Sequence, residues 1–209
     1  MSSRPPGRDI RPAPRGHGWL RRVLPAVSFS VLAACSDSAS EPNLEHMVAL
    51  DPPRDVAAFE LTDQHGRPFT AADLRDRWTV LFVGFTRCPD ICPTTLGLLA
   101  SVEKKMANLR RPVQFVFVSA DPERDTPSRL RDYVSLFNAE WTALGGPFDQ
   151  LDRLLDSLQL AYVKVPTGNG DYTIVHSTAL VLIDPEARMV GFYPAPHEPA
   201  ELVADLESL

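Results

Sequence analysis

Cysteine, basic charge and long apolar runs are all scarce in this sequence. Its 209 residues include only 3 cysteines, too few to build a scaffold from disulfides. The apolar run at residues 23–34 has twelve residues, whereas a membrane-spanning helix needs about 20. Residues 1–34 hold six arginines and one acid, so the other 175 residues carry a net charge of −11 and the whole chain −6. This acidity argues against a nucleic-acid partner, because phosphate contacts need a concentrated basic face.

The N-terminus has the features of a bacterial export signal. An arginine-rich start precedes the apolar run, which ends in the sequence Leu-Ala-Ala-Cys at residues 32–35. This ending resembles a lipobox, in which the cysteine is acylated and becomes the new N-terminus. The alternative is an ordinary cleavage site that happens to precede a cysteine. We therefore expect a lipoprotein-type signal peptide over 1–34, a lipid anchor at Cys35, and a domain held at a bacterial membrane, in the periplasm or otherwise outside the cytoplasmic membrane.

The remainder divides into a tether and one folded domain. Residues 35–54 are rich in Ser, Pro and acids without apolar periodicity, which predicts a flexible tether. From residue 55 to 209, short apolar runs alternate with amphipathic stretches. The pattern predicts strands over 56–61, 79–85, 113–119, 141–144, 177–183 and 188–193, and helices over 93–109, 127–137, 147–158 and 199–206. Strand, helix, strand within about 40 residues is a βαβ crossover. We expect an α/β domain of the thioredoxin type, with a central mixed sheet flanked by helices.

Two cysteines stand where the strand at 79–85 passes into a helix. Cys88 and Cys92 are four residues apart, so both sulfurs can lie on one side of the helix start. Such a pair can form a structural disulfide, act as a redox pair or hold a soft metal. A third ligand would favour metal, and the candidate is His176, for which a partly buried structural histidine is the alternative. Two thiolates and one imidazole suit copper, and three protein ligands leave the ion accessible.

Three segments resemble a known family in the expected order. Residues 84–93, with Cys-Pro-x-x-Cys-Pro after Gly-Phe-Thr, look like the signature of the Sco/SenC copper chaperones. Residues 119–127 and 172–185 resemble that family's two further motifs. The resemblance implies a thioredoxin-like fold in which Cys88, Cys92 and His176 bind copper. It also implies delivery of copper to the binuclear copper centre of a haem-copper cytochrome oxidase subunit, or reduction of that centre's disulfide by the redox-active cysteines.

Two positions depart from the family pattern, and one carboxylate adds to the predicted site. Arg87 stands where the family often has His, and Val175 where it commonly has Asp. The first adds a cation expected to lower the thiolate pKa, and the second removes an acidic neighbour. Asp121, after the strand at 113–119, is either a carboxylate supporting the site or partner docking, or a turn and cap residue.

Three hypotheses follow. The leading one is a membrane-tethered copper chaperone rather than an enzyme, whose partners are the oxidase subunit and other periplasmic copper carriers. The second is a metal-independent thiol-disulfide oxidoreductase or peroxidase-like enzyme using Cys88 and Cys92. The third is an acyl-anchored domain stapled by one disulfide. Histidines 46, 65 and 197 are expected to be solvated rather than ligating.

Overall fold

The computed structural model describes residues 42–106, 113–168 and 170–209. The predicted signal peptide, Cys35 and the first part of the predicted tether lie outside these residues, as does the end of the helix expected over 93–109. Within the described part of the chain, no helix is both long and apolar enough to cross a membrane.

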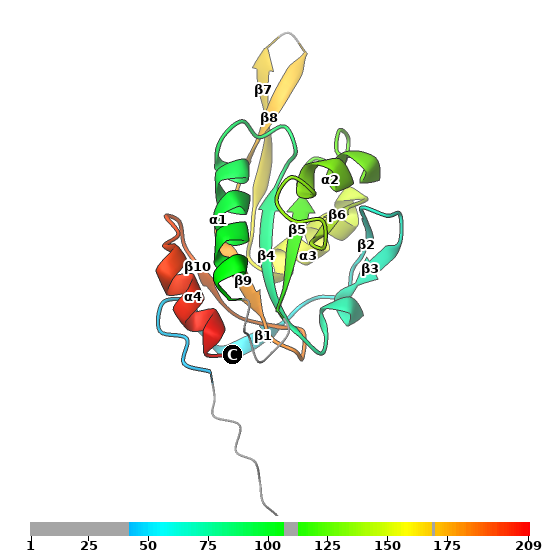
Figure 1. The fold of residues 1–209 in the computed structure, drawn as a ribbon. Helices are drawn as coiled ribbons and strands as arrows, with labels where there is room; N and C mark the ends of the chain where they lie inside the picture. Colours follow the sequence, from blue (N-terminus) through cyan, green and yellow to red (C-terminus); the bar gives the residue numbers. More distant parts are fainter. Residues whose placement is uncertain (1–41, 107–112, 169) are drawn as a thin grey trace, which may run out of the picture. The chain divides into compact units, whose positions relative to one another are not determined.

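A mixed sheet forms the centre of the domain (Figure 1). Its eight strands have the order β1-β10-β9-β4-β5-β6-β2-β3. The central strands β4, β5 and β6 are parallel, and the strands outside them join antiparallel to their neighbours. The strands are β1 (Val48–Asp55), β2 (Glu60–Asp63), β3 (Pro68–Thr70), β4 (Trp78–Gly84), β5 (Val113–Ser119), β6 (Thr142–Gly145), β9 (Leu180–Ile183) and β10 (Arg188–Tyr193).

The continuous apolar sequence of β4 reflects its position. All seven of its residues are buried, because β5 and β9 pair with its edges and side chains cover both of its faces. Helices α1 (Ile91–Lys105) and α4 (Pro199–Glu207) pack side by side on one face, whereas α3 (Phe148–Ser157) lies behind the sheet in Figure 1. A short 3₁₀ helix, η1 (Ala71–Leu74), precedes β4, and α2 (Pro127–Val134) joins β5 to β6. The predicted α/β class with a mixed central sheet flanked by helices is confirmed.

A second, two-stranded sheet was not predicted. Strands β7 (Tyr162–Gly168) and β8 (Asp171–His176) form a hairpin that extends beyond the main sheet. None of the strands expected from the sequence covers residues 162–176. The strand expected over 177–183 is shorter than predicted and begins at Leu180, while the strand expected over 56–61 is displaced to Glu60–Asp63.

The folded part of the chain begins before the predicted boundary. Strand β1 occupies residues 48–55 of what was expected to be tether and folding boundary, and it pairs with β10. The preceding residues are held by the buried carboxylate of Asp205 on α4. It accepts hydrogen bonds from the backbone N–H of Glu45 (3.1 Å) and His46 (3.1 Å), from His46 Nδ1 (2.8 Å) and from the hydroxyl of Tyr193 (3.1 Å). The tether therefore cannot extend to residue 54.

The histidines expected to be solvated differ in their surroundings. His65 is exposed in the turn before β3. His46 is exposed as well, although its ring bonds to Asp205. The prediction was wrong for His197, whose half-buried ring bonds through Nε2 to the carbonyl of Thr178 at 3.0 Å. None of the three belongs to the cluster described below.

Asp205 offers a test of how much these contacts stabilise the domain. Replacing it by alanine leaves several donors without their acceptor, so Asp205→Ala should lower the free energy of unfolding by roughly 1–3 kcal/mol. Urea denaturation measures this change. The matched control is Glu207→Ala, an exposed position on the same helix, which should stay within about 0.5 kcal/mol of the parent. Equal effects of the two substitutions would contradict the assignment.

Candidate metal centre

The junction between β4 and α1 places two sulfurs together. Cys88 lies in the turn after β4, where its N–H donates to the carbonyl of Phe85 at 3.2 Å. Cys92 is the second residue of α1, so its N–H has no partner within the helix and donates to Cys88 Sγ at 3.4 Å. Cys88 is 9% exposed and Cys92 is fully buried, and both are free thiols. The structure therefore brings the pair together without a disulfide.

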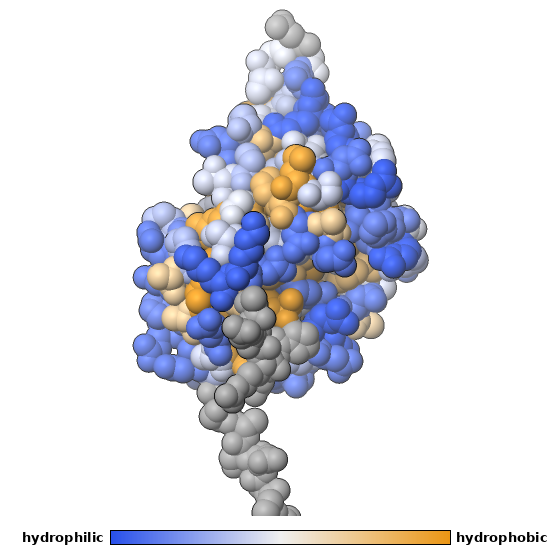
Figure 2. Space-filling model, viewed as in Figure 1, coloured by the Kyte–Doolittle hydropathy of each residue, from blue (hydrophilic) through white to orange (hydrophobic). Residues whose placement is uncertain are grey.

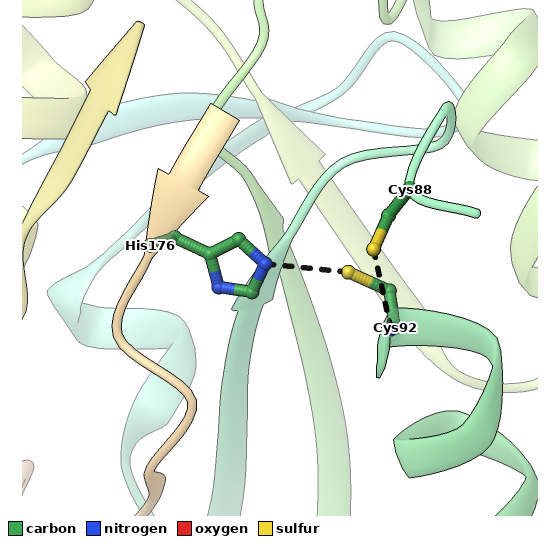
Figure 3. A group of neighbouring side chains, drawn as sticks. All are labelled: Cys88, Cys92 and His176. Atoms are coloured by element: carbon green, nitrogen blue, oxygen red, sulfur yellow. Dashed lines mark hydrogen bonds between the residues drawn. The ribbon is translucent and has the colours of Figure 1, made fainter. Parts of the chain in front are cut away.

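His176 approaches the pair from the other sheet (Figure 3). It is the last residue of β8, and its Nε2 lies 3.4 Å from Cys92 Sγ. Its Nδ1 lies 2.9 Å from the carbonyl oxygen of Ser177. A carbonyl oxygen can only accept, so Nδ1 carries the proton and Nε2 presents a lone pair to the sulfur.

Packing holds this ring in place and keeps it neutral. The rings of Phe82 and Phe85 lie edge-to-face against the imidazole of His176. Each centroid is 6.0 Å from the imidazole centroid, and the interplanar angles are 77° and 84°. Burial lowers the pKa of His176, which favours the neutral imidazole that binds metals. Burial, with the hydrogen bond to Cys88, raises the pKa of the Cys92 thiol. Without a metal this thiol is therefore protonated and can donate to Nε2, and a bound metal would take the place of that proton.

The three predicted ligands form one group. One ligand atom each from Cys88, Cys92 and His176 lie within 4.8 Å of one another, and no other group of three or more possible ligands occurs in the described ranges. Two sulfurs and one imidazole nitrogen fit a soft or borderline metal, and the three-ligand set leaves a coordination position open.

Asp125 supports the turn that carries Cys88, a role the sequence analysis did not assign. Its buried carboxylate accepts from the N–H of Thr86 at 2.9 Å, from the hydroxyl of Thr86 at 2.6 Å and from the hydroxyl of Ser119 at 2.6 Å. In the sequence, Asp125 stands just before the helix expected over 127–137. The sequence did contain a signal for this role, namely a carboxylate shortly after a strand that is parallel to β4. Parallel neighbouring strands end at the same edge of the sheet, so this carboxylate lies near the turn after β4.

Asp121 lies outside the three-ligand group. Its carboxylate accepts hydrogen bonds from the side chain of Arg124 and from the hydroxyl of Tyr172 on β8. Asp121 therefore supports the hairpin that carries His176. Docking of a partner at Asp121 stays a prediction. The two departures from the family pattern are both exposed, Arg87 beside Cys88 and Val175 on β8.

The surface over the junction is partly apolar. Ile91, next to Cys92, is 42% exposed. Figure 2 shows an apolar area near the β4–α1 junction within surroundings that are mostly hydrophilic. The buried sulfurs therefore lie close to a surface that another protein can contact through apolar side chains.

Gly84, the last residue of β4, gives Cys92 its space. A Cβ atom at Gly84 would lie 2.9 Å from Cys92 Sγ and 2.7 Å from the ring of Phe117. Both distances are shorter than van der Waals contact, so a side chain here displaces the sulfur or the ring.

Two glycine substitutions test this packing. Gly84→Ala should lower the free energy of unfolding by about 1–3 kcal/mol through overpacking, as measured by urea denaturation. The control is Gly97→Ala within α1, where an added Cβ meets nothing within 4 Å and the higher helix propensity of alanine should stabilise the chain by up to about 1 kcal/mol. A Gly84→Ala chain as stable as the parent would show that the space is not required.

Comparison with known proteins agrees with these observations. The family model described as SCO1/SenC matches residues 48–209. A protein of Stutzerimonas stutzeri named for copper binding is 40% identical over 180 residues, covering 85% of this chain and 88% of the relative. The mitochondrial SCO1 homolog 1 of Arabidopsis thaliana is 31% identical, and the match covers 94% of this chain but 62% of that relative.

Solved structures extend the match to three dimensions. The copper-bound ScoI of Arabidopsis thaliana is 34% identical with a TM-score of 0.68, covering 72% of this chain and 94% of that one. The copper-bound ScoI of Bradyrhizobium japonicum is 36% identical with a TM-score of 0.66, covering 73% and 98%. By sequence and by fold, this chain belongs to the SCO1/SenC family.

Proposed function

We propose that this chain binds copper through Cys88, Cys92 and His176. The observation that carries the proposal is the group of two sulfurs and one imidazole nitrogen within 4.8 Å of one another. Thiolate is a soft ligand suited to Cu(I), and imidazole binds copper in either oxidation state. Three ligands leave the ion open to a receiving protein, whereas a structural zinc site is normally closed by four. The relatives solved with copper bound support the same choice of metal.

The proposed task is assembly of the binuclear copper centre of a haem-copper cytochrome oxidase. The chain would deliver copper to that centre, or reduce its cysteines before the metal enters. The apolar surface near Ile91 suits contact with the receiving subunit or with other periplasmic copper carriers, and the acidic domain suits a partner with basic charge.

The proposed location follows from the N-terminal sequence. The lipobox-like residues 32–35 support removal of the signal peptide and acylation of Cys35. The domain would then act at the surface of a bacterial membrane, outside the cytoplasmic membrane. The bonds of Glu45 and His46 to Asp205 mark where the chain joins the folded domain, so a tether between Cys35 and these residues would leave the domain free to meet a membrane-bound oxidase.

Titration with Cu(I) and Cu(II) tests the ligand set. In the reduced full chain, Cys88→Ala and Cys92→Ala should lose binding of both ions. Loss of a hydrogen-bond partner outside the ligand set weakens metal binding by roughly 10–100-fold. His176→Ala removes a ligand itself and should weaken Cu(II) binding by more than that. His65→Ala, an exposed histidine outside the cluster, should bind as the parent does. Unchanged Cu(II) binding by His176→Ala would overturn the three-ligand site.

Free thiols at Cys88 and Cys92 also favour a second candidate, a metal-independent thiol-disulfide oxidoreductase. The two thiols would become a disulfide while two electrons and two protons convert the disulfide of the partner into two thiols. Oxidation of the pair removes both thiolates, so it should also release bound copper.

One variant separates the two candidates. His176→Ala keeps both thiols but lacks the imidazole. In cells deprived of the native gene, it should fail to restore the copper content of the oxidase if copper delivery is the task, and it should restore that content if reduction suffices. Cys92→Ala should fail in either case. Measurement of oxidase-bound copper, with His65→Ala as the positive control, decides between them.

A further inference from the structure

The ligands come from two separate parts of the domain. Cys88 and Cys92 belong to the β4–α1 junction of the main sheet, whereas His176 ends β8 in the hairpin. The hairpin has its own two-stranded sheet and shares no ladder with the main sheet in the described ranges. It extends beyond the main sheet in Figure 1. The position of His176 relative to the sulfurs is therefore fixed by the short connection from β8 to β9, which pairs with β4, and by the contacts that hold the hairpin to the domain.

A cluster of side chains clamps the hairpin to the loop after β5. The ring of Tyr172 on β8 lies between two cations, with the guanidinium carbon of Arg124 at 3.5 Å and the Nζ of Lys164 at 3.8 Å from its centroid. Its hydroxyl donates to Asp121 Oδ1 at 2.7 Å and lies 3.1 Å from Glu123 Oε2. We call these five residues the Tyr172 clamp.

Arg124 makes most of the connections across the clamp. Its Nη1 donates to the backbone carbonyl of Tyr172 at 2.9 Å and to Asp171 Oδ1 at 3.0 Å, and its Nε donates to Asp121. The side chain of Arg124 is 15% exposed and that of Asp121 is 2% exposed. Water therefore screens this pair poorly. The Lys164–Glu123 pair is half exposed and contributes less.

The clamp acts on the face of β8 that carries the metal ligand. Side chains alternate along a strand, so Tyr172, Ile174 and His176 lie on one face. Tyr172 and Ile174 face the body of the domain, where Ile174 is buried. Holding Tyr172 fixes the rotation of β8 about its own axis, and so the direction in which His176 points. Further polar contacts hold the root of the hairpin. Ser177 and Ala161 exchange two hydrogen bonds, the hydroxyl of Tyr162 donates to Asp152 on α3 at 2.8 Å, and His197 bonds to the carbonyl of Thr178 at 3.0 Å.

The oxidation states of copper differ in their need for His176. Two soft thiolates satisfy Cu(I), while Cu(II) prefers nitrogen and a larger set of ligands. A hairpin free to move would therefore lose Cu(II) and still hold Cu(I) at the cysteines.

We propose that the Tyr172 clamp is a positioning device that keeps His176 in the ligand set, and thereby sets the preference of this site for Cu(II) relative to Cu(I). The proposal rests on the proposed copper binding. A docking partner that disturbs the contact between the hairpin and residues 121–124 would release His176 from the metal and leave the metal on the two sulfurs.

Two clamp variants and one control test the proposal in the full chain. Tyr172→Phe removes the hydroxyl contacts but keeps the ring between the cations, and Arg124→Gln removes the cation and its link to the Tyr172 carbonyl. The control is Val163→Ala on β7, at an exposed position on the hairpin face opposite Tyr172. Competition titrations with Cu(I) and Cu(II) chelators give the affinities. Nitrogen hyperfine splitting in the Cu(II) electron paramagnetic resonance spectrum reports whether His176 is bound, and thermal unfolding confirms that each variant is folded.

The expected result is a change in preference between the two ions. Tyr172→Phe should weaken Cu(II) binding about 10-fold, and Arg124→Gln by up to about 100-fold, with reduced nitrogen splitting, unchanged Cu(I) affinity and a control like the parent. Equal weakening of both ions, or Cu(II) binding unchanged in a folded Tyr172→Phe, would overturn the clamp. Failure of the parent chain to bind either ion would overturn the proposed copper binding itself, which keeps the two outcomes apart.

Discussion

The imidazole of His176 donates its Nδ1 proton to the carbonyl of the next residue, and the remainder of the site depends on that bond. If Nε2 carried the proton instead, the ring would direct an N–H at the sulfur of Cys92 and offer it no lone pair. Phe82 and Phe85 hold the plane of the ring at the required angle. The absence of a side chain at Gly84 leaves space for the sulfur of Cys92. With the tautomer reversed, these contacts would still hold the ring, but Nε2 could no longer serve as a ligand.

The loop after β5 connects both parts that supply ligands. Asp125 holds the turn that carries Cys88 through Thr86, while Asp121 and Arg124 hold the hairpin that carries His176. The two carboxylates are four residues apart and face different neighbours. A shift of this loop therefore changes the distance between the sulfurs and the imidazole, even though the loop supplies no ligand.

Local sequence patterns were enough to predict the strands of the parallel core and to select Cys88, Cys92 and His176 as candidate ligands. The apolar run over 79–85 predicted a strand because its composition reflects burial directly, and the two cysteines follow this strand where the expected helix begins. The hairpin was missed because residues 162–176 have no regular alternation of apolar and polar side chains. Its exposed outer face carries Val163 and Val175, while its inner face combines Lys164 with Tyr172 and Ile174, so apolar residues do not mark the buried face.

Contacts between distant segments account for the other errors. Residues 48–55 have two prolines and alternate poorly, so their pairing with β10 depends on a partner more than 130 residues away. The bonds from Asp205 to Glu45 and His46 join positions about 160 residues apart. The supporting role of Asp125 was missed because Thr86, which it holds, lies 39 residues earlier. No local pattern contains such information.

The pairing of the first strand with the last one also determines when the domain can finish folding. As the chain is synthesised from its N-terminus, residues 45–55 must wait for β10 and for Asp205 on α4, which follow them by more than 130 residues. A nascent chain that still lacks β10 and α4 therefore has an incomplete sheet edge, and its residues 45–55 have no partner to hold them. This part of the fold can form only once α4 is available, so it forms late however early its own residues are made.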